Sequence, residues 1–253
     1  LLEQELGPRG VLKITRNPVM WGIGLWSLAH MVPNGDWASL LFFGTKITYA
    51  ELDRLVNRFA RALAGLGVKK GDRVALMLPN IPQMVIAYYG TLRLGAIAVT
   101  TNPLYHAHEL EVQLKDSGAE TLVAVDLFYP VVAQALPKTA VKNLILCGIK
   151  DYLPFPLNLL YPIKAMIEKQ WVSVKRVPPI HDFLALIAHA SDVARPGVPV
   201  SSQDTAILQY TGGTTGIPKG AILTHRNLVV NAVQCRTWLT VRNEGEERIL
   251  SVI

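Results

Sequence analysis

Strand-like and helix-like segments alternate through most of the chain, and this alternation limits the possible folds more than any other feature of the sequence. Continuous apolar runs such as RVALML (73–78), TLVAVD (121–126) and NLILCG (143–148) are typical of buried β-strands. Segments with helical periodicity lie between these runs, so that a strand recurs about every 20 to 25 residues. The pattern predicts right-handed βαβ crossovers and an α/β fold: a largely parallel sheet with helices on both faces.

The best-defined helix is expected over residues 49–65. Thr48 is followed three residues later by Glu51, which is the spacing of a capping box at a helix start. Four apolar residues then fall on one helical face: Leu52, Val56, Phe59 and Leu63. Further strands are expected at 96–102 and 204–211, and further helices at about 82–95, 108–118, 129–136, 180–190 and 224–239.

Composition excludes several classes of protein. Half of the 253 residues are hydrophobic and only 17% are charged, which is enough for a substantial core and argues against disorder. Cys147 and Cys235 belong to no CxxC pair or Cys/His cluster, so neither a zinc site nor a disulfide framework is predicted. A reducing, cytoplasmic setting is the expectation.

The net charge of +6 is concentrated in one region. Residues 138–180 hold seven basic and two acidic residues, a net charge of +5, and the stretch 152–171 mixes them with apolar side chains. This composition suits either a solvated basic loop or a peripheral contact with an anionic membrane surface. Three prolines, at 154, 156 and 162, favour the loop because they interrupt a long amphipathic helix. No nucleic-acid-binding motif accompanies the charge.

The first 39 residues are expected to form an N-terminal extension. The apolar run VMWGIGLWSLAHMV (19–32) follows two basic residues as a signal peptide would, but it is too short to span a bilayer and no clear cleavage site comes after it. A buried or partly exposed helix is expected here. Residues 40–253 then form one domain, in which 150–200 is a variable, basic, proline-containing insert.

The stretch YTGGTTGIPKGA (210–221) is the most informative motif. Its glycines let backbone N–H groups approach an anion closely, its threonines add hydroxyl donors and its lysine adds a positive charge. The Walker A pattern does not fit, because Pro218 and Gly220 flank Lys219, and the dinucleotide pattern GxGxxG fails at Thr211. The loop therefore predicts a polyphosphate site of another kind, between a strand and a helix. The alternative is a flexible turn with a surface lysine.

The motif YTGGTTGIPKGAILTHRN resembles the phosphate-binding motif of the acyl-activating (adenylate-forming, AMP-binding) superfamily, in the form found in bacterial long-chain fatty acyl-CoA synthetases. The stretches 47–80 and 90–105 are similar to other blocks of that family, and the resemblance covers roughly residues 40–253. It implies the fold of the N-terminal subdomain of these enzymes. It also implies an acid–thiol ligase that uses ATP, Mg²⁺ and coenzyme A.

The reaction implied by the resemblance has two halves. A fatty acid carboxylate forms acyl-AMP and releases pyrophosphate, and coenzyme A then displaces AMP. By the family's motif, the residues that hold the β- and γ-phosphates are Thr211, Gly212, Gly213, Thr214, Thr215, Gly216 and Lys219. Catalytic residues and metal ligands of the family are expected beyond residue 253. The chain is therefore interpreted as an N-terminal fragment that is inactive by itself.

Three histidines receive no catalytic role. His225 could be a base beside the loop, but it stands where a helix begins, which favours capping and packing. His106 and His108 are two residues apart and would not share a helical face, so no metal site is predicted.

Two alternative functions stay open. The first is an adenylate-forming ligase for another carboxylic acid. The second is a non-catalytic module that uses residues 138–180 to bind a membrane surface or a protein partner. Homo-oligomerisation is also compatible with the sequence.

Overall fold

The computed structural model describes residues 39–42, 45–167, 172–190, 197–211 and 219–238. Leu40–His225 forms one compact unit. The second unit comprises Leu1–Ser39 and Arg226–Ile253, and its described part is Ser39 and helix α10 (His225–Trp238) from Arg226 onward. The expected helix over 19–32 lies outside the described residues.

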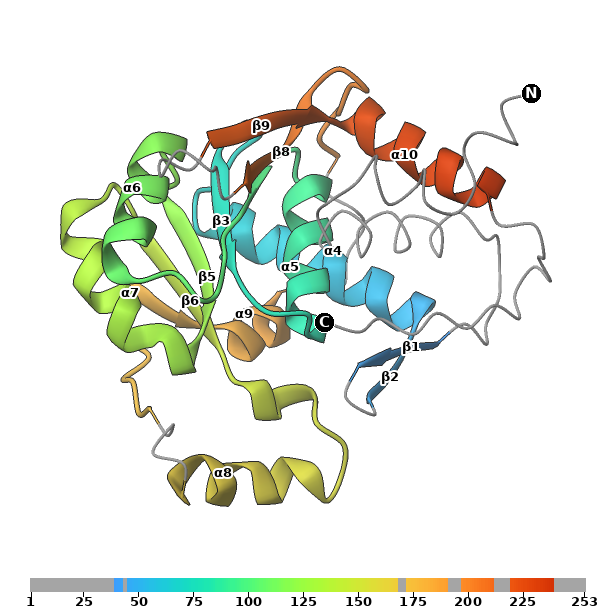
Figure 1. Ribbon diagram of the computed structural model, residues 1–253. Coiled ribbons are helices and arrows are strands. Elements are labelled where there is room, and N and C mark those ends of the chain that lie inside the picture. Colours follow the sequence, from blue (N-terminus) through green and yellow to red (C-terminus); the bar gives the residue numbers. More distant parts are fainter. Residues whose placement is uncertain (1–38, 43–44, 168–171, 191–196, 212–218, 239–253) are drawn as a thin grey trace, which may run out of the picture. The chain divides into compact units, whose positions relative to one another are not determined.

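A seven-stranded mixed sheet forms the centre of the larger unit (Figure 1). Its order is β7-β6-β5-β3-β4-β8-β9. The strands are β3 (Arg73–Met77), β4 (Ile97–Thr100), β5 (Thr121–Val125), β6 (Asn143–Cys147), β7 (Ile180–Asp182), β8 (Thr205–Thr211) and β9 (Lys219–Thr224). Every neighbouring pair is parallel except β8 and β9, which are antiparallel. The expected α/β fold with a largely parallel sheet is confirmed.

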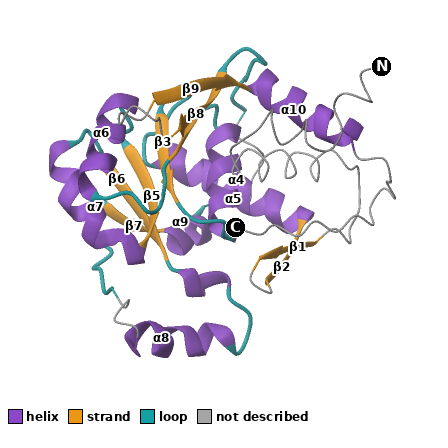
Figure 2. Ribbon diagram, viewed as in Figure 1, coloured by secondary structure: helices purple, strands orange, loops and turns teal. Residues whose placement is uncertain are grey.

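Right-handed crossovers explain which face each helix covers. The chain moves from β3 to β4 in one direction across the sheet and then reverses, from β4 past β3 to β5 and on to β6. Right-handed crossovers therefore put the helix after β3 on one face and the helices after β4 and β5 on the other. The helices are α4 (Tyr49–Gly65), α5 (Pro82–Arg93), α6 (Ala107–Ser117), α7 (Tyr129–Ala135), α8 (Leu157–Ile167) and α9 (Phe183–His189). Figure 2 shows α6 and α7 on one face of the sheet and α4, α5 and α9 on the other.

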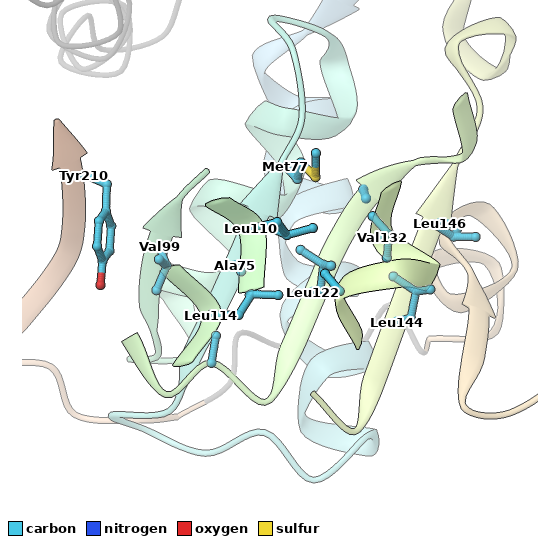
Figure 3. Packing of buried hydrophobic residues seen from close by; sticks show 13 residues of the cluster. Ala75, Met77, Val99, Leu110, Leu114, Leu122, Val132, Leu144, Leu146 and Tyr210 are labelled. Atoms are coloured by element: carbon cyan, nitrogen blue, oxygen red, sulfur yellow. The ribbon is translucent and has the colours of Figure 1, made fainter. Parts of the chain in front are cut away.

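The core between the sheet and the pair α6 and α7 is built from small and branched side chains. Leu110 and Leu114 of α6 and Val132 of α7 are fully buried against the strands (Figure 3). The strand residues that meet them are Ala75, Met77, Val99, Leu122, Ala124, Leu144 and Leu146. Their alternate spacing along β3, β5 and β6 is that of residues on one face of a strand. On the other face, α5 contacts β3 and β4, α9 contacts β6 and β7, and α4 packs against α5 and α9.

Helix α4 begins and ends where the sequence predicts. Thr48 Oγ1 accepts a hydrogen bond of 3.2 Å from the backbone N–H of Glu51, which satisfies one of the N–H groups left free at the helix start. The four predicted apolar residues are all buried. Before this helix, β1 (Ser39–Phe42) and β2 (Thr45–Thr48) form a separate two-stranded sheet.

Five helices and strands of the described residues were not predicted: β1 and β2, which precede the regular pattern, and α8, β7 and β9. Helix α8 forms within the proline-containing insert with Pro162 inside it, although proline was expected to interrupt a helix here. Strand β7 precedes α9 in a segment predicted to be entirely helical. Strand β9 occupies residues expected to lie in a loop before a helix. Short 3-10 turns are Asp126–Phe128, Leu136–Lys138 and Ile149–Tyr152.

Candidate phosphate-binding site

The predicted phosphate loop connects the two antiparallel strands β8 and β9. Thr211 is the last residue of β8 and Lys219 the first of β9, and the two are paired across the strands. The structure thus brings together the first and last residues of the predicted set. The intervening ones, Gly212, Gly213, Thr214, Thr215 and Gly216, lie outside the described residues.

The loop does not lead directly into a helix, and the prediction of a strand-to-helix connection was wrong. The chain returns after residue 218 as β9 along β8, and helix α10 begins only at His225. The reason is local: KGAILT (219–224) pairs its backbone with β8, and its β-branched residues Ile222 and Thr224 suit a strand. The loop still lies at the carboxyl end of β8, which is parallel to β4, and open α/β sheets bind ligands outside the carboxyl ends of their parallel strands.

Tyr210, directly before the loop, is a buried residue whose hydroxyl is hydrogen-bonded to a helix. Its side chain is 8% exposed and belongs to the core cluster with α6. Its hydroxyl donates a hydrogen bond of 2.5 Å to the Asp116 Oδ2 atom of that helix. Burial, and then the neighbouring Asp116 carboxylate, raise the pKa of Tyr210. The phenol therefore stays protonated and acts as a donor at neutral pH.

Buried polar side chains line up beside this region at the ends of β4 and β8. Gln113 Nε2 donates to the backbone oxygen of Thr100 at 2.9 Å, and Thr100 is paired with Gln209 across the two strands. Within the described part of the chain, the Oγ1 atom of Thr100 and the Oε1 atoms of both glutamines have no hydrogen-bond partner. Sequence reasoning missed this group, because isolated polar residues in apolar strands do not reveal which neighbours they meet.

His225 lies at the opposite end of β9 from the loop. Thr224 is paired with Thr205 at the start of β8, and about 17 Å of strand separates Lys219 from Thr224. The backbone N–H of His225 donates to the Asp204 backbone oxygen at 3.1 Å, at the first residue of α10. This position excludes His225 as a base beside Lys219 and agrees with a structural role at the helix start.

No metal site emerges from the described residues. His106 and His108 are both exposed at the start of α6, and the His106 backbone N–H donates to Glu109 Oε2 at 2.9 Å. Across the described ranges, no group of three or more His, Cys, Asp or Glu side chains could hold a metal ion. None of the described helices is long and apolar enough to cross a membrane.

Curated relatives of this chain include ligases. The chain is 39% identical over 219 residues to the Long-chain-fatty-acid–CoA ligase of Bacillus subtilis (strain 168), covering 86% of this chain and 39% of the relative. It is 40% identical over 234 residues to the ligase of the same name from Yersinia pestis, covering 90% of this chain and 42% of the relative. The chain thus spans about two fifths of the length of these relatives.

A solved structure agrees with both the fold and the sequence relatives. The crystal structure of a long-chain-fatty-acid-CoA ligase (FadD1) from Archaeoglobus fulgidus superposes with a TM-score of 0.64 at 27% identity, over 83% of this chain and 39% of that one. The model of the AMP-binding enzyme family matches residues 29–253, which include the whole seven-stranded sheet and the loop after β8. The chain therefore belongs to the family of AMP-binding enzymes.

Proposed function

We propose that this chain supplies the phosphate-binding part of an ATP-dependent ligase that joins long-chain fatty acids to coenzyme A. The observation that carries the proposal is the glycine- and threonine-rich loop at the carboxyl end of β8, with Thr211 and Lys219 paired at its two ends. The names and 37–40% identities of the curated relatives support the fatty-acid substrate. The complete polypeptide would carry out the reaction in the cytoplasm.

In the first half of the proposed reaction, a carboxylate oxygen attacks the α-phosphorus of ATP. The bond to the β-phosphate oxygen breaks and pyrophosphate leaves with the additional negative charge. Backbone N–H groups of the loop, the hydroxyls of Thr211, Thr214 and Thr215, and the Lys219 ammonium would stabilise that charge. Donors that are already in position are effective here because they need no reorganisation during the reaction.

In the second half, the sulfur of coenzyme A attacks the acyl carbon and AMP leaves. We assign none of the described side chains to this step. Mg²⁺ is part of the proposal as the usual companion of ATP, but the described residues gather no carboxylate cluster that fits it. The phosphate contacts proposed here therefore rest on the loop and Lys219.

The nature of the acid is tested by measuring pyrophosphate release from ATP with a panel of acids. We expect the complete polypeptide to respond to long-chain fatty acids and much less to acetate, benzoate or amino acids. Pyrophosphate release that depends on an aromatic acid or an amino acid instead would agree with an adenylate-forming ligase but would overturn the proposal of a fatty-acid substrate. No release with any acid would overturn the ligase reaction itself.

Peripheral contact with an anionic membrane is a second candidate function, which one specific observation favours. Helix α8 exposes a stripe of apolar side chains, in a region whose net charge is +5 between residues 138 and 180. The exposed fractions are 62% for Leu159, 53% for Leu160, 56% for Ile163, 64% for Met166 and 76% for Ile167. An apolar helix face with basic residues in its flanking sequence is the pattern that binds the interface of anionic lipid bilayers.

Vesicle co-sedimentation tests this contact independently of any enzymatic activity. We expect binding to vesicles that contain anionic lipid, weaker binding to neutral ones, and loss of binding in the double variant Leu159→Ser, Ile163→Ser. Leu104→Ser is the matched control, because Leu104 is 80% exposed and lies outside the basic region. Equal binding of the double variant and the control variant would overturn the role of α8.

A further inference from the structure

Tyr210 joins three elements: the two adjacent strands β8 and β9, and helix α6, which lies far from them in the sequence. It belongs to β8, its hydroxyl donates to Asp116 at the end of α6, and its ring lies against Gly220 of β9. In Figure 3 its side chain lies at the edge of the core cluster nearest Val99. We call this arrangement of Tyr210, Asp116 and Gly220 the Tyr210 contact.

Gly220 provides the space that the ring occupies. Tyr210 and Gly220 are directly paired across the antiparallel strands, so both face the same side of the sheet. A Cβ atom added at position 220 would lie 3.1 Å from Tyr210 Cζ and 3.2 Å from its Cε2 atom, closer than most such contacts. The absence of a side chain at 220 therefore lets the tyrosine ring cover β9 while its hydroxyl reaches α6.

Among the described elements, strand β9 packs extensively only against β8. In the sheet formed by the described residues it is an edge strand, paired with β8 alone. Its residues from Lys219 to Ile222 are exposed, and Ile222 retains 67% of its accessible surface. An edge strand with little buried surface opens readily. The buried Tyr210 ring, which is hydrogen-bonded to α6, is thus an important contact for the first residues of β9.

Successive residues of a strand face opposite sides of the sheet, so the Lys219 side chain points away from the face on which Gly220 meets the Tyr210 ring. The Tyr210 contact consequently restrains the strand from the face of α6 and leaves the lysine face accessible. Lys219 is the neighbour of Gly220 in the chain, and its backbone position depends on that of Gly220.

We propose that Tyr210 is a positioning residue for Lys219. By linking Gly220 to Asp116, it keeps the start of β9 paired with the end of β8, and it thereby holds the lysine where the loop requires it. This inference rests on the proposed function only where it expects Tyr210 to affect the reaction with ATP through Lys219. The restraint of β9 itself is a property of the fold and can be measured without substrate.

Amide hydrogen exchange of the peptide that covers β9 tests the restraint in the complete polypeptide. Tyr210→Phe keeps the ring and removes one hydrogen bond, so we expect exchange in β9 to be about fivefold faster. Tyr88→Phe is the matched control: that tyrosine is 4% exposed and its hydroxyl has no partner among the described residues. The control should leave β9 exchange unchanged. Unchanged exchange in Tyr210→Phe would overturn the proposal.

Asp116 provides a second route to the same test, because its exposed position makes substitutions safe for folding. Asp116→Ala should accelerate β9 exchange as much as Tyr210→Phe, and the two changes together should add little to either one. Asp116→Asn keeps an oxygen acceptor and should retain most of the protection. Full additivity of the two single changes would show that the hydrogen bond is not the link, and would overturn the proposal.

Adenylation kinetics then separate this inference from the proposed function. We expect Tyr210→Phe to lower kcat/KM for ATP about fivefold in a wild-type background and to have no further effect in Lys219→Ala. If Lys219→Ala adenylates at the wild-type rate, the proposed function of the lysine fails, while the exchange data still test the contact. If Tyr210→Phe lowers kcat/KM equally in both backgrounds, the tyrosine does not act through the lysine and the inference is overturned.

Discussion

The surroundings of His225 determine its protonation state and indicate a structural role. It lies beside the Lys70–Asp204 ion pair, whose Nζ to Oδ2 distance is 2.7 Å, and its Nε2 atom is buried without a hydrogen-bond partner in the described region. Burial lowers the pKa of His225, Asp204 opposes this shift, and Lys70 adds to it. The imidazole is therefore held in its neutral form, as a packed group at the start of α10.

The depressed pKa of His225 predicts a specific dependence of stability on pH. The unfolded chain binds a proton at about pH 6.5, whereas the folded protein does so only at lower pH, so acidification through this range favours unfolding. We expect the free energy of unfolding to fall between pH 7.5 and 5.5 in the wild type, and to fall less in His225→Gln. Denaturant titrations at both pH values measure the difference. Parallel pH profiles for the two proteins would contradict the assignment.

The packing of α4 on α5 depends on a glycine. A Cβ atom added at Gly90 of α5 would lie 2.7 Å from Phe59 Cδ1 and 3.3 Å from the backbone nitrogen of Ala60. The Phe59 side chain is fully buried and its ring centroid lies 5.0 Å from that of Phe183 in α9, so it has little room to move. The absence of a side chain at Gly90 therefore sets the distance between the two helices.

Replacing this glycine should destabilise the fold although alanine is the better helix former. We expect Gly90→Ala to lower the free energy of unfolding by about 2 kcal/mol, because overpacking outweighs the gain in helix propensity. Gly65→Ala is the matched control at the end of α4, where an added Cβ atom has nothing within 4 Å. The control should be neutral or slightly stabilising. Thermal or chemical unfolding that ranks the two variants in the reverse order would refute the packing account.

Arg176 links two carboxylates at the ends of strands in the same sheet. Its Nη2 atom is 3.3 Å from Asp126 Oδ2 after β5, and its Nε atom is 3.7 Å from Asp182 Oδ2 at the end of β7. Burial raises the pKa of Asp126, and Arg176 is the main opposing influence. Arg176 thus links the carboxyl ends of β5 and β7 through these two ion pairs.

Removing the arginine should matter more at neutral than at acidic pH. In Arg176→Ala the pKa of Asp126 in the folded protein rises further, because the partly buried carboxylate has lost its positive partner. At low pH the carboxyl group is protonated and the loss costs little. As the pH rises through the folded pKa, the group ionises without its partner and the free energy of unfolding falls. We expect a cost of about 1 kcal/mol at pH 7 and a smaller one at pH 4. Lys142→Ala is the control, since its pair with Glu120 is exposed and should contribute little at either pH. If Arg176→Ala lowers the free energy of unfolding by the same amount at both pH values, this role of Arg176 is contradicted.

The elements that could be predicted from sequence are those with a strong local signal. Helix α4 has both a cap and an apolar stripe, and β3, β5 and β6 are continuous apolar runs, so their positions can be read from the sequence. Strand β9 carries neither signal, because an exposed edge strand is defined by its partner β8. Helix α8 forms despite Pro162, which a rule based on single residues cannot anticipate.

The same limit applies to the candidate site. Thr211 and Lys219 were identified from the motif, and the structure pairs them. Tyr210 and Gly220 stand in the same motif, but their contact with each other and with Asp116 depends on how β9 and α6 meet in space. For residues 212–216, phosphate binding stays a prediction from the family motif.

At the scale of the whole molecule, the sheet order determines where the loop lies. Strand β4 lies between β3 and β8, and all three are parallel, so the loop lies at the carboxyl edge of the sheet, where α/β enzymes bind nucleotides. The chain spans 39% of its Bacillus subtilis relative, and so the activity must be assayed on the complete polypeptide. That assay connects the fold to its proposed chemistry.

Exchange of labelled pyrophosphate into ATP, dependent on a long-chain fatty acid, tests the central claim most directly, because it reports formation of acyl-AMP without coenzyme A. For the complete polypeptide we predict exchange that requires the fatty acid. In Lys219→Ala it should fall by about a hundredfold, on the order of 3 kcal/mol, with the thermal unfolding midpoint unchanged. Lys142→Ala should match the wild type. Wild-type exchange in Lys219→Ala, or no exchange in the wild-type protein, would contradict the account.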